Sequence, residues 1–333
     1  DEYLDEDELE TEFEGALGRL TRNHSKQQGV GKTIALISPS GGGGVSTITT
    51  NLGAGLAQVA GSCALFDLKL QTGDLAPLLN LRPPYTLAEF CHNIDQVDDE
   101  LFEKCMARHH CGAALMAAPL AAADLDYVTL QGIRQGMNMA CDNYPYLLAD
   151  LDHHPSEEQN EVLQRADLVL LVMRMEFTGL RNTYRMLEYM QYLGINRDLI
   201  KIVVNRRGQP KEIPSSKTEK LLGKPIYHNI PDDPKSVQKA NNCGCPVVLN
   251  SPRSRAARSL VELSRKLHAM CGAEDSLPAA ASWTSRLFGK HAQKNGAGAP
   301  VEVGENTSPD GPHGVRAYRS PGATRWFDEH EAA

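Results

Sequence analysis

Short apolar runs alternate with amphipathic stretches between residues 34 and 270. Each apolar run has the length of a buried strand, and the stretches between the runs carry apolar residues at helical spacing. The predicted strands lie at 34–37, 63–66, 114–118, 146–149, 168–173, 199–204 and 226–229. The predicted helices lie at 46–58, 86–92, 98–108, 124–142, 156–165, 178–193 (with Thr178 as N-cap) and 254–270.

This alternation predicts an α/β domain whose mostly parallel sheet is flanked by helices on both faces. Parallel strands need long crossover connections, and helices supply them. Ligands of such sheets bind at the carboxyl ends of the strands. Residues 41–46, Asp67, Asp150 and Asn205 each lie at such an end, so the sequence gathers them at one edge of the sheet.

A glycine-rich loop joins the first predicted strand to the first predicted helix. A strand that passes through glycines into a helix N-terminus directs backbone N–H groups and the positive end of the helix dipole at an anion, typically a phosphate. Against the pattern G-x-x-x-x-G-K-[ST], Gly44 and Ser46 match, whereas Pro39 replaces the first glycine and Val45 replaces the lysine. The loop is therefore either a phosphate loop without its lysine or an ordinary tight connection.

Composition and charge divide the chain into three parts. The 333 residues, 41% of them hydrophobic, suffice for one α/β domain with tails. The net charge is -8, and residues 1–14 hold nine acidic residues and no basic ones, which leaves +1 for the rest. We predict an acidic linker at 1–30, a folded domain at 31–272 and a largely disordered tail at 273–333, rich in Gly, Pro, Ala and Ser.

The eight cysteines are scattered, and the sequence has no signal peptide and no run of about 18 apolar residues. This favours a cytosolic setting with free thiols. The pairs in 109–111 and 243–245 lack zinc spacing and are interpreted as buried or incidental thiols. At 282–290, Trp283, Leu287 and Phe288 would share a helix face, as in an interfacial anchor, but the segment is too short to bind a membrane firmly alone.

Several ordered motifs resemble the ParA/MinD class of deviant-Walker ATPases. After the glycine loop and Asn51 come Asp67-x-x-x-Gln71, then Asp150 behind an apolar strand, then Asn205. Within that class, four further segments resemble the TadZ/CpaE pilus-assembly proteins. These segments are Gly-Asp-Leu-Ala-Pro-Leu-Leu at 73–79, Gly-Ala-Ala-Leu-Met-Ala-Ala-Pro at 112–119, Gly-Leu-Arg-Asn at 179–182 and Ile-Pro-Asp-Asp at 230–233.

The resemblance implies a P-loop fold and a role in biogenesis of the Tad (Flp, type IVb) pilus. It implies a cytoplasmic homodimer that lies at the inner membrane face or the cell pole and contacts components of the pilus machine. The segment at 282–290 adds a peripheral membrane contact as an option. Because related proteins often carry a receiver-like domain ahead of this one, we expect such a domain upstream of the acidic linker.

The resemblance further implies ATP or ADP with Mg²⁺ as the ligand. Mg²⁺ is expected at Ser46, with Asp67 and with Asp150 through water, while Asn205 and Arg206 flank the adenine. The residues expected to bind the nucleotide are Gly41, Gly42, Gly43, Gly44, Val45, Ser46, Thr47, Asp67, Lys69, Asp150, Asn205, Arg206, Pro231 and Asp232.

Three charged groups of active relatives are replaced here. The two loop lysines fall on Ser40 and Val45, and the acid that helps to position the attacking water falls on Lys69. A charge-assisted hydrogen bond to phosphate contributes about 1.5–3 kcal/mol, so nucleotide binding should weaken by roughly ten- to a hundred-fold without being lost. Lys69 is a candidate substitute cation. We predict a pseudo-ATPase with no catalytic residues.

Other functions stay open at this stage. An active positioning or partitioning ATPase is the main alternative, and a loop that binds no nucleotide is another. A tyrosine kinase is disfavoured because the tail holds only Tyr318. Arg255, Arg258 and Arg265 could form a basic stripe for nucleic acid, but Glu262 interrupts it, so a solvated helix face is favoured. Asp67 and Asp150 could also be ordinary strand-end caps.

Overall fold

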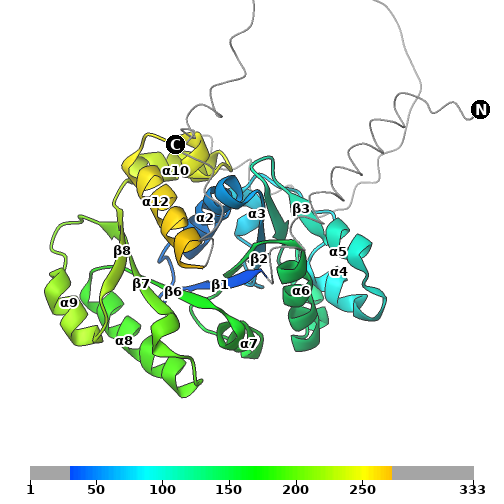
Figure 1. Cartoon of the computed structure of the whole chain (residues 1–333), viewed down its shortest axis with the longest axis horizontal. Coiled ribbons are helices and arrows are strands. Elements are labelled where there is room, and N and C mark those ends of the chain that lie inside the picture. The colour runs from blue at the N-terminus through cyan, green and yellow to red at the C-terminus, as the bar shows by residue number, and fades with distance from the viewer. Residues whose placement is uncertain (1–30, 272–333) are drawn as a thin grey trace, which may run out of the picture. The chain divides into compact units, whose positions relative to one another are not determined.

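The computed structural model describes residues 31–271 (Figure 1). The predicted acidic linker at 1–30, the predicted tail at 273–333 and its segment at 282–290 lie outside the described residues. Within 31–271, the strands form one eight-stranded sheet. They are β1 (Lys32–Ile37), β2 (Cys63–Asp67), β3 (Met106–Arg108), β4 (Ala113–Met116), β5 (Tyr146–Asp150), β6 (Leu168–Met173), β7 (Ile200–Arg207) and β8 (Ile226–Pro231).

The sheet order is β3-β4-β2-β5-β1-β6-β7-β8. Every neighbouring pair is parallel except β3 and β4, which are antiparallel. The prediction of a mostly parallel sheet is therefore confirmed. Strand β1 lies in the interior of the sheet between β5 and β6, so the loop that follows β1 leaves the sheet beside the carboxyl end of β5.

Helices cover both faces of the sheet, as predicted. Figure 1 shows α2, α10 and α12 on one face and α6, α7 and α8 on the other. The α-helices are α2 (Val45–Ala60), α3 (Leu75–Leu78), α4 (Leu87–His92), α5 (Asp99–Cys105), α6 (Leu130–Asn143), α7 (Glu157–Arg165), α8 (Phe177–Tyr192), α9 (Ser215–Leu222), α10 (Pro234–Asn242), α11 (Val247–Asn250) and α12 (Arg255–Met270). Short 3₁₀ helices span Ile94–Gln96, Ala122–Tyr127 and Arg197–Leu199.

Three sequence predictions need correction. The helix predicted at 98–108 ends at Cys105, because the next three residues pair with β4 as the edge strand β3. The helix predicted at 124–142 is split: a 3₁₀ helix ends at Tyr127, and α6 begins after Thr129, whose hydroxyl accepts the Gly132 N–H. The N-cap of α8 is Glu176 and not Thr178.

The core is densest where the strands are covered on both faces. The β1 residues from Ile34 to Ile37 are fully buried, as are Leu170 in β6 and Phe66 in β2. Each such aliphatic or aromatic side chain contributes about 1.5–3 kcal/mol by leaving water. Burial on both sides explains why these strands read as unbroken apolar runs instead of alternating ones.

Helix α2 is tied to the segment that contains α10 and α11. The Asn241 side-chain amide donates to Thr47 Oγ1 (3.1 Å), and the Asn51 side-chain oxygen accepts the Val248 N–H (3.0 Å). Both contacts join the first two turns of α2 to residues nearly 200 positions later. No helix among residues 31–271 is long and apolar enough to cross a lipid bilayer.

Candidate functional site

The glycine loop occupies residues 38–44, and α2 begins directly after it at Val45. Gly44 is the N-cap with φ +89°, a left-handed conformation that favours glycine. Among the residues that the structure describes, no side chain caps this helix start, and its first turn holds no acidic residue. The first backbone N–H groups of α2 and its dipole are thus directed at the loop, which is the arrangement that binds a phosphate.

Close packing holds the loop in shape. The Asn205 side-chain amide, at the end of β7, donates to the Gly43 carbonyl (2.8 Å). A methyl group at Gly43 would overlap the Ser38 hydroxyl, and one at Gly44 would overlap the Asn205 amide. Glycine at these two positions therefore lets the neighbouring polar groups reach the loop backbone.

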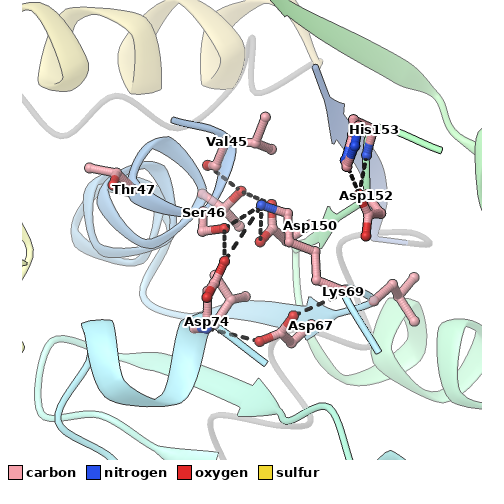
Figure 2. A network of polar contacts seen from close by, with 12 residues as sticks. Val45, Ser46, Thr47, Asp67, Lys69, Asp74, Asp150, Asp152 and His153 are labelled. Carbon is pink, nitrogen blue, oxygen red and sulfur yellow. Dashed lines mark hydrogen bonds and ion pairs between the residues drawn. The ribbon is translucent and has the colours of Figure 1, made fainter. Parts of the chain in front are cut away.

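The ammonium of Lys69 points into a cluster of oxygens beside the loop (Figure 2). Lys69 Nζ donates to Ser46 Oγ (2.7 Å) and lies 3.7 Å from Asp150 Oδ2 and 3.8 Å from Asp74 Oδ2. Ser46 Oγ in turn donates to Asp74 Oδ2 (3.3 Å). The Lys69 side chain is 18% exposed and that of Asp150 is buried, so solvent screens this pair weakly, whereas Asp74 is 49% exposed and better screened. The Lys69 ammonium therefore contacts the Ser46 hydroxyl and lies near the carboxylates of Asp150 and Asp74.

Asp67 is bound locally at the end of β2. Its Oδ1 accepts the Lys69 N–H (3.2 Å) and its Oδ2 accepts the Leu75 N–H (2.8 Å). Both carboxylate oxygens thus fix the turn that carries Lys69 and the start of α3. Its expected contact with Mg²⁺ stays a prediction, and the carboxylate that contacts Ser46 directly is Asp74.

Asp150 ends β5 next to β1 and is fully buried. Its Oδ1 accepts the Thr49 hydroxyl (3.4 Å). Its Oδ2 accepts no hydrogen bond from residues 31–271, and the Lys69 ammonium lies 3.7 Å from it. Burial raises the pKa of Asp150, and the Lys69 ammonium offsets only part of this effect. Burial, and then the charge of Asp150, also raise the pKa of Asp67.

These raised pKa values set the sign of a pH effect on stability. Above about pH 4, the ordinary pKa of aspartate, the unfolded chain has lost protons that the native chain still holds. The free energy of unfolding should therefore fall as the pH rises from about 4 through the raised pKa values. Asp150→Asn should flatten this fall, whereas Asp126→Asn, at an exposed position, should not. Urea unfolding of the wild type, Asp150→Asn and Asp126→Asn at several pH values measures how the free energy of unfolding changes with pH. Equal slopes in all three would contradict the prediction.

The residues predicted to flank the base lie on neighbouring strands. Arg206 is exposed, with φ +54°, and its N–H donates to the Asn205 side chain (2.9 Å). The Asp232 N–H donates to the Arg207 carbonyl (2.8 Å), which brings the end of β8, with Pro231, beside the end of β7. The structure therefore brings these residues to the same edge of the sheet as the glycine loop, and their role toward adenine stays a prediction.

Sequence reasoning missed two polar residues at the loop. Asp74 contacts Ser46 and Lys69, and the Asn182 side-chain amide donates to Ser40 Oγ (3.0 Å). Both lie in segments that carried the family resemblance, 73–79 and 179–182. That signal could have identified them.

Val45 is buried, while Gly41 and Gly42 are exposed at the tip of the loop.

The residues present do not fit a divalent ion while Lys69 holds this position. Mg²⁺ binds oxygen at about 2.0–2.1 Å and requires near-octahedral oxygen ligands. Lys69 Nζ is 2.7 Å from Ser46 Oγ, the hydroxyl expected to hold the metal, and faces Asp150 as well. An ion between Ser46 and Asp150 would meet the ammonium, so Lys69 would have to leave.

The chain is similar in sequence to several known proteins. An uncharacterised ATP-binding protein from Methanocaldococcus jannaschii is 25% identical over 236 residues, which cover 70% of this chain and 86% of the relative. The septum site-determining protein MinD from Thermotoga maritima is 24% identical over 250 residues, covering 72% and 88%. No family model matches the chain.

Solved structures share the fold. A ParA family ATPase from Chlorobium tepidum superposes with a TM-score of 0.67 at 23% identity, covering 70% of this chain and 98% of the ATPase. MinD from Pyrococcus horikoshii, in complex with Mg-ADP, gives 0.65 at 18% identity, covering 74% and 99%. In a MinC:MinD complex from Aquifex aeolicus the match gives 0.62 at 21% identity, covering 75% and 98%. The chain is therefore similar in sequence to MinD proteins, and it shares the α/β fold of ParA and MinD ATPases.

Proposed function

We propose that this chain is a nucleotide-binding positioning factor of the TadZ/CpaE kind that binds ATP or ADP and does not turn ATP over. One observation carries the proposal. The loop keeps the backbone amides that bind phosphate and the Ser46 hydroxyl, whereas Ser40, Val45 and Lys69 stand where active relatives have two lysines and an acid. The pocket therefore has the shape of a nucleotide site without the groups that drive hydrolysis.

The contacts of these three residues support the absence of turnover. Phosphoryl transfer requires cations facing the developing charge and a group that positions the attacking water. Ser40 Oγ is held by Asn182, and Val45 is a buried apolar side chain. Lys69, an ammonium bonded to Ser46, has no lone pair that could accept a hydrogen bond from the attacking water. Binding should also be weaker than in relatives with both lysines, because a phosphate contact is missing.

Calorimetry combined with a phosphate-release assay tests the pocket. We expect heat of binding with ATP and with ADP, and phosphate release no faster than in a blank without protein. Asp150→Ala removes the carboxylate that ends β5 and serves as the control for a contaminating ATPase. Turnover above the blank that disappears in Asp150→Ala would overturn the proposal in favour of an active MinD-type ATPase.

The proposed cellular role rests on the segments that resemble TadZ/CpaE proteins and on the family's link to positioning. The named relatives include a protein that determines the septum site, and one structural neighbour is a complex with MinC. We propose that this chain acts as a cytoplasmic homodimer at the membrane face or cell pole and contacts components of the Tad pilus machine. Deleting its gene should abolish pili in electron micrographs, and normal piliation in the deletion strain would refute the role.

The active positioning ATPase is retained as a second candidate because of one contact. The Lys69 ammonium reaches Ser46 at the helix N-terminus and could supply part of the charge that Val45 lacks. If this candidate is correct, Lys69→Met should lower turnover strongly. If the first proposal is correct, there is no turnover to lower.

A further inference from the structure

We propose that the Lys69 ammonium takes the place of the divalent metal ion in this pocket, so that the chain binds ATP or ADP at least as well without Mg²⁺ as with it. The inference rests on the proposed nucleotide binding at the glycine loop and deepens it. It makes the metal-free nucleoside di- or triphosphate the natural ligand.

The first argument is the position of the ammonium. Lys69 Nζ has three oxygen neighbours, namely Ser46 Oγ at 2.7 Å, Asp150 Oδ2 at 3.7 Å and Asp74 Oδ2 at 3.8 Å (Figure 2). These are a hydroxyl and two carboxylates, the hard oxygen ligands that Mg²⁺ uses in proteins. Ser46 lies in the first turn of α2, where a phosphate on the loop would be adjacent. The cation therefore stands between the acids and the phosphate position.

The second argument is how firmly Lys69 is held there. Its backbone N–H donates to Asp67 Oδ1, and Asp67 Oδ2 accepts the Leu75 N–H. The Leu68 N–H donates to the Asp150 carbonyl (3.0 Å), and the Gln159 side-chain amide donates to the Leu68 carbonyl (2.7 Å). The turn is thus fixed on both sides of the residue. The side chain starts from a rigid base and needs little ordering to reach the pocket.

The third argument is charge. Asp150 and Asp74 face the loop, and without a cation these carboxylates would repel a polyphosphate. In this chain the cation is tethered, so it is present at every nucleotide concentration and cannot be removed by a chelator. A tethered monovalent ammonium carries less charge than Mg²⁺, which agrees with a weakened site. It also excludes the metal, because the two compete for Ser46 Oγ.

The test compares the Kd for ATP by calorimetry in buffer with excess MgCl₂ and in buffer with EDTA. For the wild-type chain we expect ATP to bind at least as tightly in EDTA as in MgCl₂, because Mg²⁺ bound to ATP in solution competes with this site. Lys69→Asp removes the ammonium and restores a carboxylate at that position. It should bind ATP at least tenfold, about 1.4 kcal/mol, more tightly with MgCl₂ than with EDTA. Lys104→Asp, an exposed position on α5 paired with Glu100, is the matched control and should behave as the wild type.

A second readout follows the metal directly. Mn²⁺, which also takes oxygen ligands, is detected by its electron paramagnetic resonance signal when free. With ATP present, Lys69→Asp should remove more free Mn²⁺ than an equal amount of ATP alone, and the wild-type chain should not. Thermal unfolding shows whether each variant is folded, so that a variant that does not fold is recognised. In that case, the wild-type comparison of MgCl₂ with EDTA decides.

The outcomes separate the two proposals. ATP binding by the wild type that weakens tenfold or more in EDTA would overturn the tethered cation and leave nucleotide binding intact. Binding in neither buffer would overturn nucleotide binding itself, and this inference with it. Wild-type binding that is no weaker in EDTA than in MgCl₂, together with metal dependence in Lys69→Asp, is the result we expect.

Discussion

Gly44→Ala is expected to lower nucleotide affinity by more than a hundredfold, to below detection by calorimetry. An alanine at φ +89° is strained by about 1–2 kcal/mol, and its methyl group would overlap the Asn205 side-chain amide. Asn205 would have to leave the Gly43 carbonyl, which fixes the loop. Displacing two loop amides from a phosphate forfeits about 3–6 kcal/mol of charge-assisted hydrogen bonding.

Gly61→Ala supplies the matched control for this change. Gly61 is the C-cap of the same helix, has φ +90°, and a methyl group there would meet nothing within 4 Å. Both variants should lose about 1–2 kcal/mol of stability from backbone strain, with about 1 kcal/mol more in Gly44→Ala from the Asn205 contact. Only Gly44→Ala should lose nucleotide binding. Equal affinities in the two variants would show that the loop is not the binding site.

Phe66→Ala should reduce the free energy of unfolding by about 3–5 kcal/mol. Phe66 is fully buried in β2, and its ring packs so closely on Gly136 of α6 that a methyl group there would be 3.2 Å from Phe66 Cε2. Deleting the ring leaves a cavity between the sheet and α6 that the helix backbone cannot fill without moving. Urea unfolding measures the loss.

Phe177→Ala is the comparison for Phe66→Ala because it removes the same ring from the surface. Phe177 begins α8 and is 74% exposed, so its removal should change stability by no more than about 0.5 kcal/mol. Losses of similar size in both variants would contradict the assignment of Phe66 to the core.

The sheet could be predicted from the sequence because its central strands are buried on both faces. The runs at 34–37 and 168–173 contain only apolar residues, and this pattern leaves few alternatives in an α/β chain. Helices α9 and α10 were missed for the opposite reason. In α10 only Ala240 is buried, and in α9 only Thr218 and Leu222, so neither leaves a periodic apolar stripe in the sequence.

The sequence identified several residues of the site, but it could not predict the contacts between them. The order of motifs identified Ser46, Lys69 and Asp150, but a sequence pattern does not say which way a lysine points. That Lys69 turns toward Ser46 follows from the turn held by Asp67, a tertiary arrangement. Asp74 was passed over because it follows a turn and not a strand.

The bonds from α2 to the later part of the chain bear on how occupancy of the loop could be sensed elsewhere. Thr47 and Asn51 bind Asn241 and Val248, so the helix that begins at the loop and the segment 241–248 are mechanically linked. A ligand that shifts the first two turns of α2 must either carry that segment along or break both bonds. These two hydrogen bonds thus form a direct path by which a change at the loop could reach the segment 241–248.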